Sequence, residues 1–241
     1  MITVFVPAFN EQDNIRETVK SIRQAAERAG NGRVEIIVVN DGSSDQTATV
    51  TENLKTEIPE LSLINNEVNL GVGQSMRKAL AAAKYPKFII VPGDNDMSVE
   101  LLTQLFSNAD RADLVMSYFL NREVRGVSRN IISTIFASIY MITFGIFVQY
   151  INGPCIYPTD RLRKLNLKAN RFSIVVEATL KLLCSGASYY EVSGYMQKGL
   201  AGSTSLSWRN LTEVATSFLR LVWEIKLSGD PQFKQKPVRI Y

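Results

Sequence analysis

The first 120 residues alternate short apolar runs with longer segments in which apolar residues recur every three to four positions. Short apolar runs bounded by turn residues indicate buried strands, and the longer spacing indicates amphipathic helices. Strands are therefore expected at residues 2–6, 34–39, 61–64, 88–91 and 114–118. Helices are expected at residues 11–28, 46–56, 73–83 and 99–106, the second capped by Ser44 or Asp45. This order predicts an α/β fold with a mostly parallel sheet and right-handed crossovers.

The second half of the chain has a less regular pattern. Residues 130–148 contain no charged residue, and small or polar side chains recur there at helical spacing, namely Asn130, Thr134, Ser138 and Gly145. Further elements are expected as helices at 171–184 and 211–225 and a strand at 189–192. The chain divides on this basis into residues 1–120, residues 121–228 and a tail, 229–241, that we expect to be loosely held.

Composition excludes several kinds of chemistry. The 241 residues include no histidine, so a His base, a Ser–His or Cys–His nucleophile pair and any zinc site with His ligands are ruled out. A net charge of +4 suits a nucleotide, a lipid phosphate or an anionic membrane face, or only a solvated surface, and is too small to indicate nucleic acid. Cys155 and Cys184 are expected to be reduced and buried. The chain opens directly into its first strand without a secretory signal, which favours the cytosol.

Polar clusters follow four of the expected strands, where sheets of this kind bind ligands. They are residues 7–11 (PAFNE), 40–45 (NDGSSD), 69–73 (NLGVG) and 93–96 (GDND). Each alone is ordinary turn and helix-cap chemistry. The Gly-x-Gly-x-x-Gly fingerprint after the first strand is missing, which argues against a dinucleotide cofactor.

Asp94 and Asp96 are the most informative pair in these clusters. Two carboxylates one residue apart, in a loop after a buried strand, repel each other unless a cation lies between them. Mg²⁺ and Mn²⁺ take oxygen ligands and complete their shells with substrate phosphates. Such an ion would offset the repulsion and neutralise charge on a leaving diphosphate. The alternative interpretation is a solvated acidic turn.

Taken together, the clusters resemble glycosyltransferase family 2. The matching stretches, in the family's order and spacing, are residues 6–11, 39–47 and the Asp-x-Asp pair at 94–96. Within the family the chain is most similar to the dolichyl-phosphate and polyprenyl-phosphate hexose synthases, through residues 152–157, 172–177, 191–192 and 202–203. The resemblance implies a GT-A fold, with a Rossmann-like sheet that binds the nucleotide-sugar in residues 1–120 and a less regular acceptor-side half.

The resemblance also implies roles for individual donor-site residues. Pro7, Phe9 and Glu11 would line the nucleotide pocket, with Glu11 near the ribose. Asp41 would hydrogen-bond the base, and Gly71 would lie in the loop that closes over the nucleotide.

The implied catalytic residues are Asp96 and Arg129. Asp94 and Asp96 would hold Mg²⁺ or Mn²⁺ together with the donor diphosphate, and Arg129 would contact phosphate. Two departures from the family pattern put the phosphate acceptor in question. Ser98 replaces a usual Gln, and two cations of a late Arg-x-x-Gly-x-Ser-Lys stretch are replaced by Gly199 and Ser205, with Lys198 and Arg209 nearby.

The family inverts at the anomeric carbon by direct displacement, so the acceptor decides whether a base is needed. A hydroxyl acceptor would need an Asp or Glu as base, whereas an anionic polyprenyl phosphate needs none. No base loop is evident after Asp96, which favours a phosphate acceptor. The expected function is hexose transfer from a UDP- or GDP-sugar to a polyprenyl or dolichyl phosphate. The alternatives are transfer to a sugar hydroxyl in polysaccharide or glycolipid synthesis, and a non-catalytic relative that binds nucleotide-sugar.

The uncharged run at 130–148 bears on where the protein works. Its length approaches the ~20 residues of a transmembrane helix, but a true span would place the two halves of the active site on opposite sides of the membrane. We expect one or two helices that pack through their small-residue stripe, with the outer face on lipid or on a second copy of the chain. A plain buried core helix is the alternative. Because no transmembrane pair follows, the protein is expected to be peripheral, at the inner face of the membrane.

Overall fold

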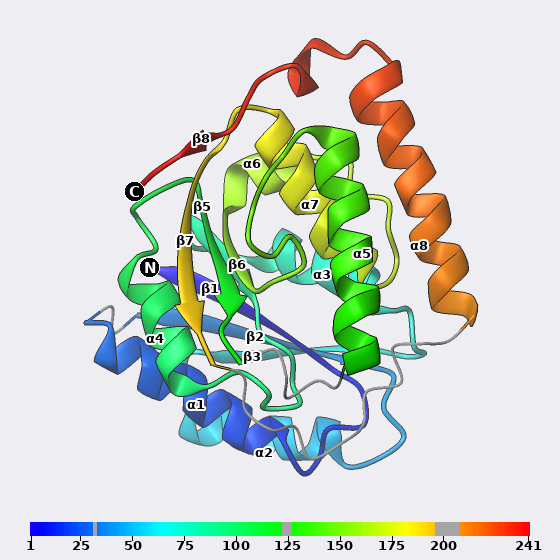
Figure 1. Ribbon diagram of the computed structural model, residues 1–241. Helices are drawn as coiled ribbons and strands as arrows, with labels where there is room; N and C mark the ends of the chain where they lie inside the picture. Colours follow the sequence, from blue (N-terminus) through cyan, green and yellow to red (C-terminus); the bar gives the residue numbers. More distant parts are fainter. Residues whose placement is uncertain (31–32, 122–126, 196–207) are drawn as a thin grey trace.

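An eight-stranded sheet runs through the described part of the protein (Figure 1). The computed structural model describes residues 1–30, 33–121, 127–195 and 208–241, without the side chains of 127–129 and 208–211. The strands follow the order β3-β2-β1-β4-β6-β5-β7-β8. Their bounds are β1 (Ile2–Ala8), β2 (Val34–Asp41), β3 (Leu61–Asn66), β4 (Lys87–Ile90), β5 (Leu114–Phe119), β6 (Cys155–Pro158), β7 (Ser188–Gly194) and β8 (Val238–Arg239).

Helices cover both faces of this sheet, as the alternating sequence pattern predicts. The α-helices are α1 (Ile15–Arg28), α2 (Thr47–Glu57), α3 (Val72–Ala82), α4 (Val99–Ser107), α5 (Val127–Phe144), α6 (Thr159–Lys164), α7 (Ser173–Cys184) and α8 (Trp208–Leu221). A π-helical turn, Val222–Leu227, continues α8, and a 3-10 turn, Pro231–Phe233, follows. Successive residues of β1 point to opposite faces. Val4 therefore joins the core under α1 and α4, while Phe5 joins the core under α3 and α7.

The predicted α/β fold is confirmed, and the central strands are parallel. β1 pairs in parallel with both β2 and β4, and β2 pairs in parallel with β3. The sequence did not predict β6, which lies antiparallel between β4 and β5. It has only four residues, follows Pro154 and ends at Pro158, so its pattern is too short to stand out. Gly153 precedes it because a Cβ there would lie 2.2 Å from the Ser117 carbonyl oxygen.

The expectation of a loosely held tail is wrong for residues 235–240. Val238 and Arg239 form β8, which extends the sheet in parallel beside β7. The backbone N–H of Gln235 donates to the Cys184 oxygen (3.1 Å), and that of Ile240 to the Tyr189 oxygen (2.8 Å). The outer edge of β7 offers unpaired backbone groups, and the tail satisfies them despite its polar composition.

Helix α5 forms at the uncharged run, but its packing differs from the prediction. Its inner face is aromatic: Tyr140 is buried, and its ring lies 4.9 Å from that of Phe218 on α8. Thr134 of the small-residue stripe is exposed and Ser138 half-buried. Large rings bury more apolar surface than small polar side chains, which is why the aromatic face wins the inner position. No helix among the described residues is long and apolar enough to cross a membrane.

Of two further expectations, one is confirmed and the other needs a correction. Cys155 and Cys184 are free thiols in the buried core, as predicted. Helix α1 begins at Ile15, four residues later than predicted, because the chain first makes a turn in which Asn14 N–H donates to the Glu11 oxygen (3.0 Å).

Candidate active site

The loops after β1 and β2 are joined by a network of side-chain to backbone hydrogen bonds. The Glu11 N–H donates to Thr47 Oγ1 (2.8 Å), and Thr47 Oγ1 donates in turn to Asp45 Oδ1 (2.5 Å). Asn10 Oδ1 accepts from the Ser44 N–H (2.9 Å). Asn10 has a left-handed φ of 58°, a conformation that asparagine tolerates well. The polar residues of both motifs thus hold the loop after β1 against the loop after β2.

Asp45 belongs to this network rather than acting as a simple helix cap. It precedes the N-cap residue Gln46, and its carboxylate accepts from the Thr47 N–H (2.9 Å) and the Gln12 N–H (3.2 Å). Its slight burial acts to raise the pKa, but these hydrogen bonds to the charged form outweigh that and lower it.

Asp41 holds the loop that precedes α3. Its side chain is buried at the end of β2, where Oδ1 accepts from Asn66 Nδ2 (2.7 Å) and the Leu70 N–H (3.0 Å). Oδ2 accepts from the Gly71 N–H (2.8 Å). A carboxylate has about four acceptor positions, so these three bonds leave room for one further donor, such as a base N–H. Gly42 allows the loop to approach: its φ is +73°, and a Cβ there would lie 2.5 Å from the Val68 carbonyl carbon.

The Asp94–Asp96 loop lies against the end of β1. The Gly93 N–H donates to the Pro7 oxygen (3.1 Å), and a Cβ on Gly93 would lie 3.5 Å from the Glu11 Cγ. The Asp96 N–H donates to Asp94 Oδ1 (3.2 Å), while Asn95 between them has φ 57°. The turn therefore places Asp94 beside Glu11.

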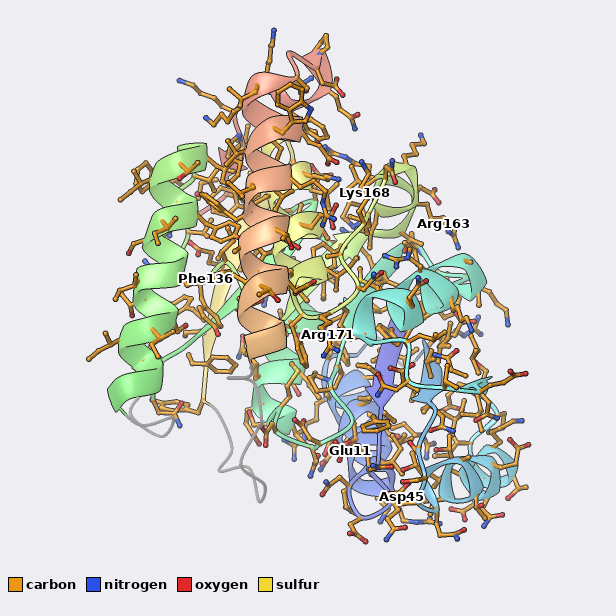
Figure 2. The ribbon with its side chains drawn as sticks, turned by 90° about the vertical axis from the view of Figure 1, so that its right-hand side faces the viewer. Glu11, Asp45, Phe136, Arg163, Lys168 and Arg171 are labelled. Atoms are coloured by element: carbon orange, nitrogen blue, oxygen red, sulfur yellow. The ribbon has the colours of Figure 1, made fainter. Side chains whose placement is uncertain are left out.

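The carboxylates of these loops interact electrostatically. Burial raises the pKa of Glu11; the hydrogen bond from Asn14 lowers it, and the charges of Asp94, Asp45 and Asp96 raise it further. Burial also raises the pKa of Asp94, against two backbone hydrogen bonds that lower it. Glu11 and Asp45 lie at the same end of the molecule (Figure 2). Negative charge is concentrated here at a cost that a cation would relieve.

The residues present fit a divalent cation whose ligands come partly from the protein and partly from a bound substrate. Among the described residues, no group of three or more Asp, Glu, Cys or His side chains could hold a metal alone. Asp94 and Asp96 supply hard oxygen ligands, and Mg²⁺ in such sites takes one or two carboxylates and completes its shell with phosphates and water. The site suits a metal that arrives with a diphosphate.

The structure gives Ser98 a clear role. It is the N-cap of α4: Oγ accepts from the Leu101 N–H (3.2 Å) and donates to the Tyr195 oxygen (3.3 Å). A serine is one of the best N-caps, so this position serves the helix and ties it to the residue after β7.

The structure brings most of the sequence-predicted residues to one edge of the sheet. Pro7 and Glu11 are half-buried at the end of β1, and Phe9 is 47% exposed there. Arg129 lies on α5, but its side chain is outside the described residues, so its role stays a prediction. The residues replacing the late basic stretch, Gly199 and Ser205, also lie outside the described part.

Sequence reasoning missed several residues that organise this edge. Asn66 donates to both Asp41 Oδ1 and Ser75 Oγ, and Lys78 donates to its Oδ1. Thr47 links Glu11 to Asp45. Thr47 lay in a matched stretch and could have been singled out. Asn66 ends an expected strand that the pattern closed two residues early, so nothing local marked it.

Comparison with known proteins identifies the relatives of this chain. The profile of Glycosyl transferase family 2 matches residues 3–168. An uncharacterized protein of Methanocaldococcus jannaschii is 26% identical over 232 residues, covering 90% of this chain and 97% of its own. A dolichyl-phosphate beta-glucosyltransferase of Trichomonas vaginalis is 31% identical over 107 residues, covering 43% of this chain. This chain spans only 32% of that enzyme's length.

Solved structures show the same fold. A crystal structure of glucosyl-3-phosphoglycerate synthase from Mycobacterium tuberculosis, in complex with Mn²⁺, uridine diphosphate and phosphoglyceric acid, superposes with a TM-score of 0.63. The match covers 91% of this chain and 78% of the other, at 18% identity. The expected GT-A fold is confirmed by this likeness.

Proposed function

This chain belongs to glycosyltransferase family 2, and we propose that it transfers a hexose from a UDP- or GDP-sugar to a polyprenyl or dolichyl phosphate, with inversion. The observation that carries the proposal is the meeting of Asp94, Asp96 and Glu11 beside the loop that Asp41 holds. This is a site for a nucleotide diphosphate and a cation at the carboxyl edge of a parallel sheet. The dolichyl-phosphate glucosyltransferases among its relatives support the acceptor class.

Each group at this edge has a proposed task. Asp41 uses its remaining acceptor position for a donor on the base, and Phe9 offers an exposed ring for the nucleotide. The backbone of Leu70–Gly73 would lie along the ribose and diphosphate of the nucleotide-sugar. Asp94 and Asp96 would hold Mg²⁺ or Mn²⁺, which when bound supplies positive charge at the leaving diphosphate. Arg129 is the proposed phosphate contact on the acceptor side.

One observation favours a second acceptor class, a sugar hydroxyl. Such an acceptor needs a general base, and no histidine exists. Glu11 is a half-buried carboxylate at this edge with a raised pKa, and under this alternative it would face the acceptor hydroxyl as the base instead of the ribose. An anionic phosphate acceptor needs no such group.

The exposed face of α5 supports peripheral contact with a membrane, which we place at the cytosolic side. Five isoleucines are between 46% and 75% exposed along this one helix, namely Ile131, Ile132, Ile135, Ile139 and Ile142. A contiguous apolar face on a helix that carries no charged residue from 130 to its end at 144 is typical of an interfacial segment. The competing occupant of this face is a second copy of the chain.

The test is nucleoside-diphosphate release from a panel of UDP- and GDP-sugars with Mn²⁺ or Mg²⁺, with and without a polyprenyl phosphate. Metal-dependent release that rises only with the lipid supports the proposal and names the donor. Release that rises with soluble saccharides but not with the lipid moves the function to hydroxyl transfer. Absence of release from every donor contradicts transfer altogether and leaves a non-catalytic relative that binds nucleotide-sugar.

A further inference from the structure

A short segment of the acceptor-side half, residues 166–170, supports the start of α3 through backbone contacts. We call it the brace. The Gly73 N–H donates to the Asn170 oxygen (2.9 Å). The Arg77 guanidinium, one turn further along α3, donates to the carbonyls of Leu167 (3.2 Å) and Ala169 (2.9 Å) and to Asn170 Oδ1 (2.7 Å). One side chain thus ties α3 to three residues of the brace.

A buried glutamate holds the other side of the brace. Glu177, on α7, is fully buried, and its carboxylate accepts from the N–H groups of Lys168 (3.0 Å) and Ala169 (2.8 Å). Lys181 neutralises it at 2.7 Å and also donates to the Asn166 oxygen (2.7 Å). A buried ion pair is weak evidence for stability, because desolvation offsets its attraction. Here it fixes the course of a loop.

Two glycines make the contact between brace and donor loop a tight one. A Cβ on Gly71 would lie 2.4 Å from the Asn170 oxygen, and one on Gly73 would lie 2.2 Å from the Ala169 oxygen. The two backbones therefore touch with no side chain between them. Because the Gly71 N–H also donates to Asp41 Oδ2 (2.8 Å), the loop is held between the brace and the end of β2.

We propose that Arg77 and Glu177 are positioning residues for the nucleotide, acting through the brace on the Leu70–Gly73 loop. The inference rests on the proposed function, since that loop is the part expected to close over the donor. Neither residue reaches the site itself. Each holds backbone atoms that set the position of the Leu70–Gly73 loop, beside which we expect the nucleotide to lie. Loss of either should weaken nucleotide binding and leave the chemical step intact.

The experiment measures the Kd of UDP and GDP with Mn²⁺ by calorimetry, together with donor KM, kcat and the thermal midpoint. The variants are Arg77→Met, which keeps the apolar stem, and Glu177→Gln, which is nearly isosteric. Both should raise Kd and donor KM about five- to tenfold, with kcat at saturating donor within about twofold of the wild type. Arg77→Lys should recover part of the affinity, because an ammonium can still reach a brace carbonyl.

Two further variants separate positioning from general loss of structure. Glu191→Gln alters another carboxylate, whose side chain is 5% exposed; it accepts from a loop N–H, that of Gln149 (2.6 Å), and pairs with Arg239 (3.0 Å). It should lower the thermal midpoint without changing the Kd. Asn170→Ala removes only an exposed contact of Arg77, so the protein should fold normally and lose about twofold in affinity.

Each remaining outcome has one meaning. A wild type that binds no nucleoside diphosphate overturns the proposed function, and the inference with it. A wild type that binds, with Arg77→Met and Asn170→Ala folded and binding equally well, overturns the brace alone. A fall in kcat at unchanged Kd also overturns it, because the brace would then act on the reaction and not on the donor.

Discussion

The carboxyl edge of the sheet and the layer formed by α5 and α8 present opposite surfaces on the same molecule. At the edge, side chains such as Asp41 and Asp45 are occupied with backbone N–H groups of neighbouring loops. In the helical layer, Tyr140 and Phe218 meet on the inside while isoleucines face outward. The edge is held by directional hydrogen bonds between specific partners. The helical layer is held by apolar packing, which has no preferred direction.

This difference shows which parts of the molecule can be predicted from the sequence alone. Asp, Asn, Ser and Gly act within a few residues of their position, so their order in the chain already encodes the loops they build. An isoleucine has the same letter whether it faces the core or the outside. The loops of the carboxyl edge were therefore visible in the sequence, while the packing of α5 depended on which of its faces the fold would bury.

The strongest test of the edge removes the negative charge of Asp94. Asp94→Asn should reduce metal-dependent transfer on the order of 100- to 1,000-fold, since cation stabilisation of a leaving diphosphate is worth several kcal/mol. The thermal midpoint without metal should not fall, because the substitution relieves repulsion with Glu11. Initial rates at several Mn²⁺ concentrations measure the effect, with the exposed Asp110→Asn as control. An equal loss in both variants would contradict a metal role.

Substitutions at two glycines test whether contact between the loops of the edge stabilises the protein. Gly42→Ala should lower the free energy of unfolding by about 2–3 kcal/mol, from a left-handed φ and from contact with Val68. Gly30→Ala is the matched control, because its φ is +70° with no atom within 4 Å of the added Cβ, so about 1–2 kcal/mol is expected there. Urea unfolding of both variants measures the difference. Equal losses would show that the loop contact contributes nothing.

The helical layer is tested by replacing apolar area that faces outward. Ile135→Ser combined with Ile139→Ser should reduce partition onto anionic phospholipid vesicles about tenfold, because the two side chains would otherwise bury apolar surface in the interface. Unfolding free energy should stay within about 0.5 kcal/mol per site. Val238→Ser, at a comparably exposed position on β8, serves as control in vesicle sedimentation. A dimer that the double variant converts to monomer would assign the face to a second copy.

The smallest expected effect is a dependence on pH that belongs to the edge alone. The pKa of Glu11 is raised above 4.5 in the folded protein, so folding favours its protonated form. Its contribution to stability therefore falls as pH rises through the window between 4.5 and the raised value. The difference in unfolding free energy between wild type and Glu11→Gln should decline across that window. The same protonation should weaken Mn²⁺ and UDP binding as pH falls. A flat difference would contradict the raised pKa.

Much of the fold followed from the sequence because the strongest patterns are local. Six of the strands, β1 to β5 and β7, and the predicted helices lie close to their predicted positions, with shifts of a few residues at their ends. The strands β6 and β8 were missed, since one has four residues and the other two, too few for any periodicity. We predicted that α5 packs through its small-residue stripe, but it packs through its aromatic face. Helical spacing alone does not show which of two faces will be buried.

The candidate site followed from the sequence only in part. Asp41, Glu11 and the Asp94–Asp96 loop meet because carboxyl ends of parallel strands share an edge. The support of the donor loop by Arg77 and Ala169 joins positions 92 residues apart, which no local pattern marks. Arg129 stays a prediction, since its side chain lies outside the described residues.

The place of β6 in the sheet also sets an order for synthesis. β4 pairs with β1 on one side and β6 on the other, and β5 lies between β6 and β7. Between the ends of β4 at residue 90 and β6 at residue 158 the ribosome must add 68 residues, which takes roughly 3–14 s. During that time the open edge of β4 lacks its partner, and so does the apolar β5 once residues 114–119 have been made. The nascent chain thus carries an exposed sheet edge after all the donor motifs have been made, and this interval is when it is most open to aggregation or to a chaperone.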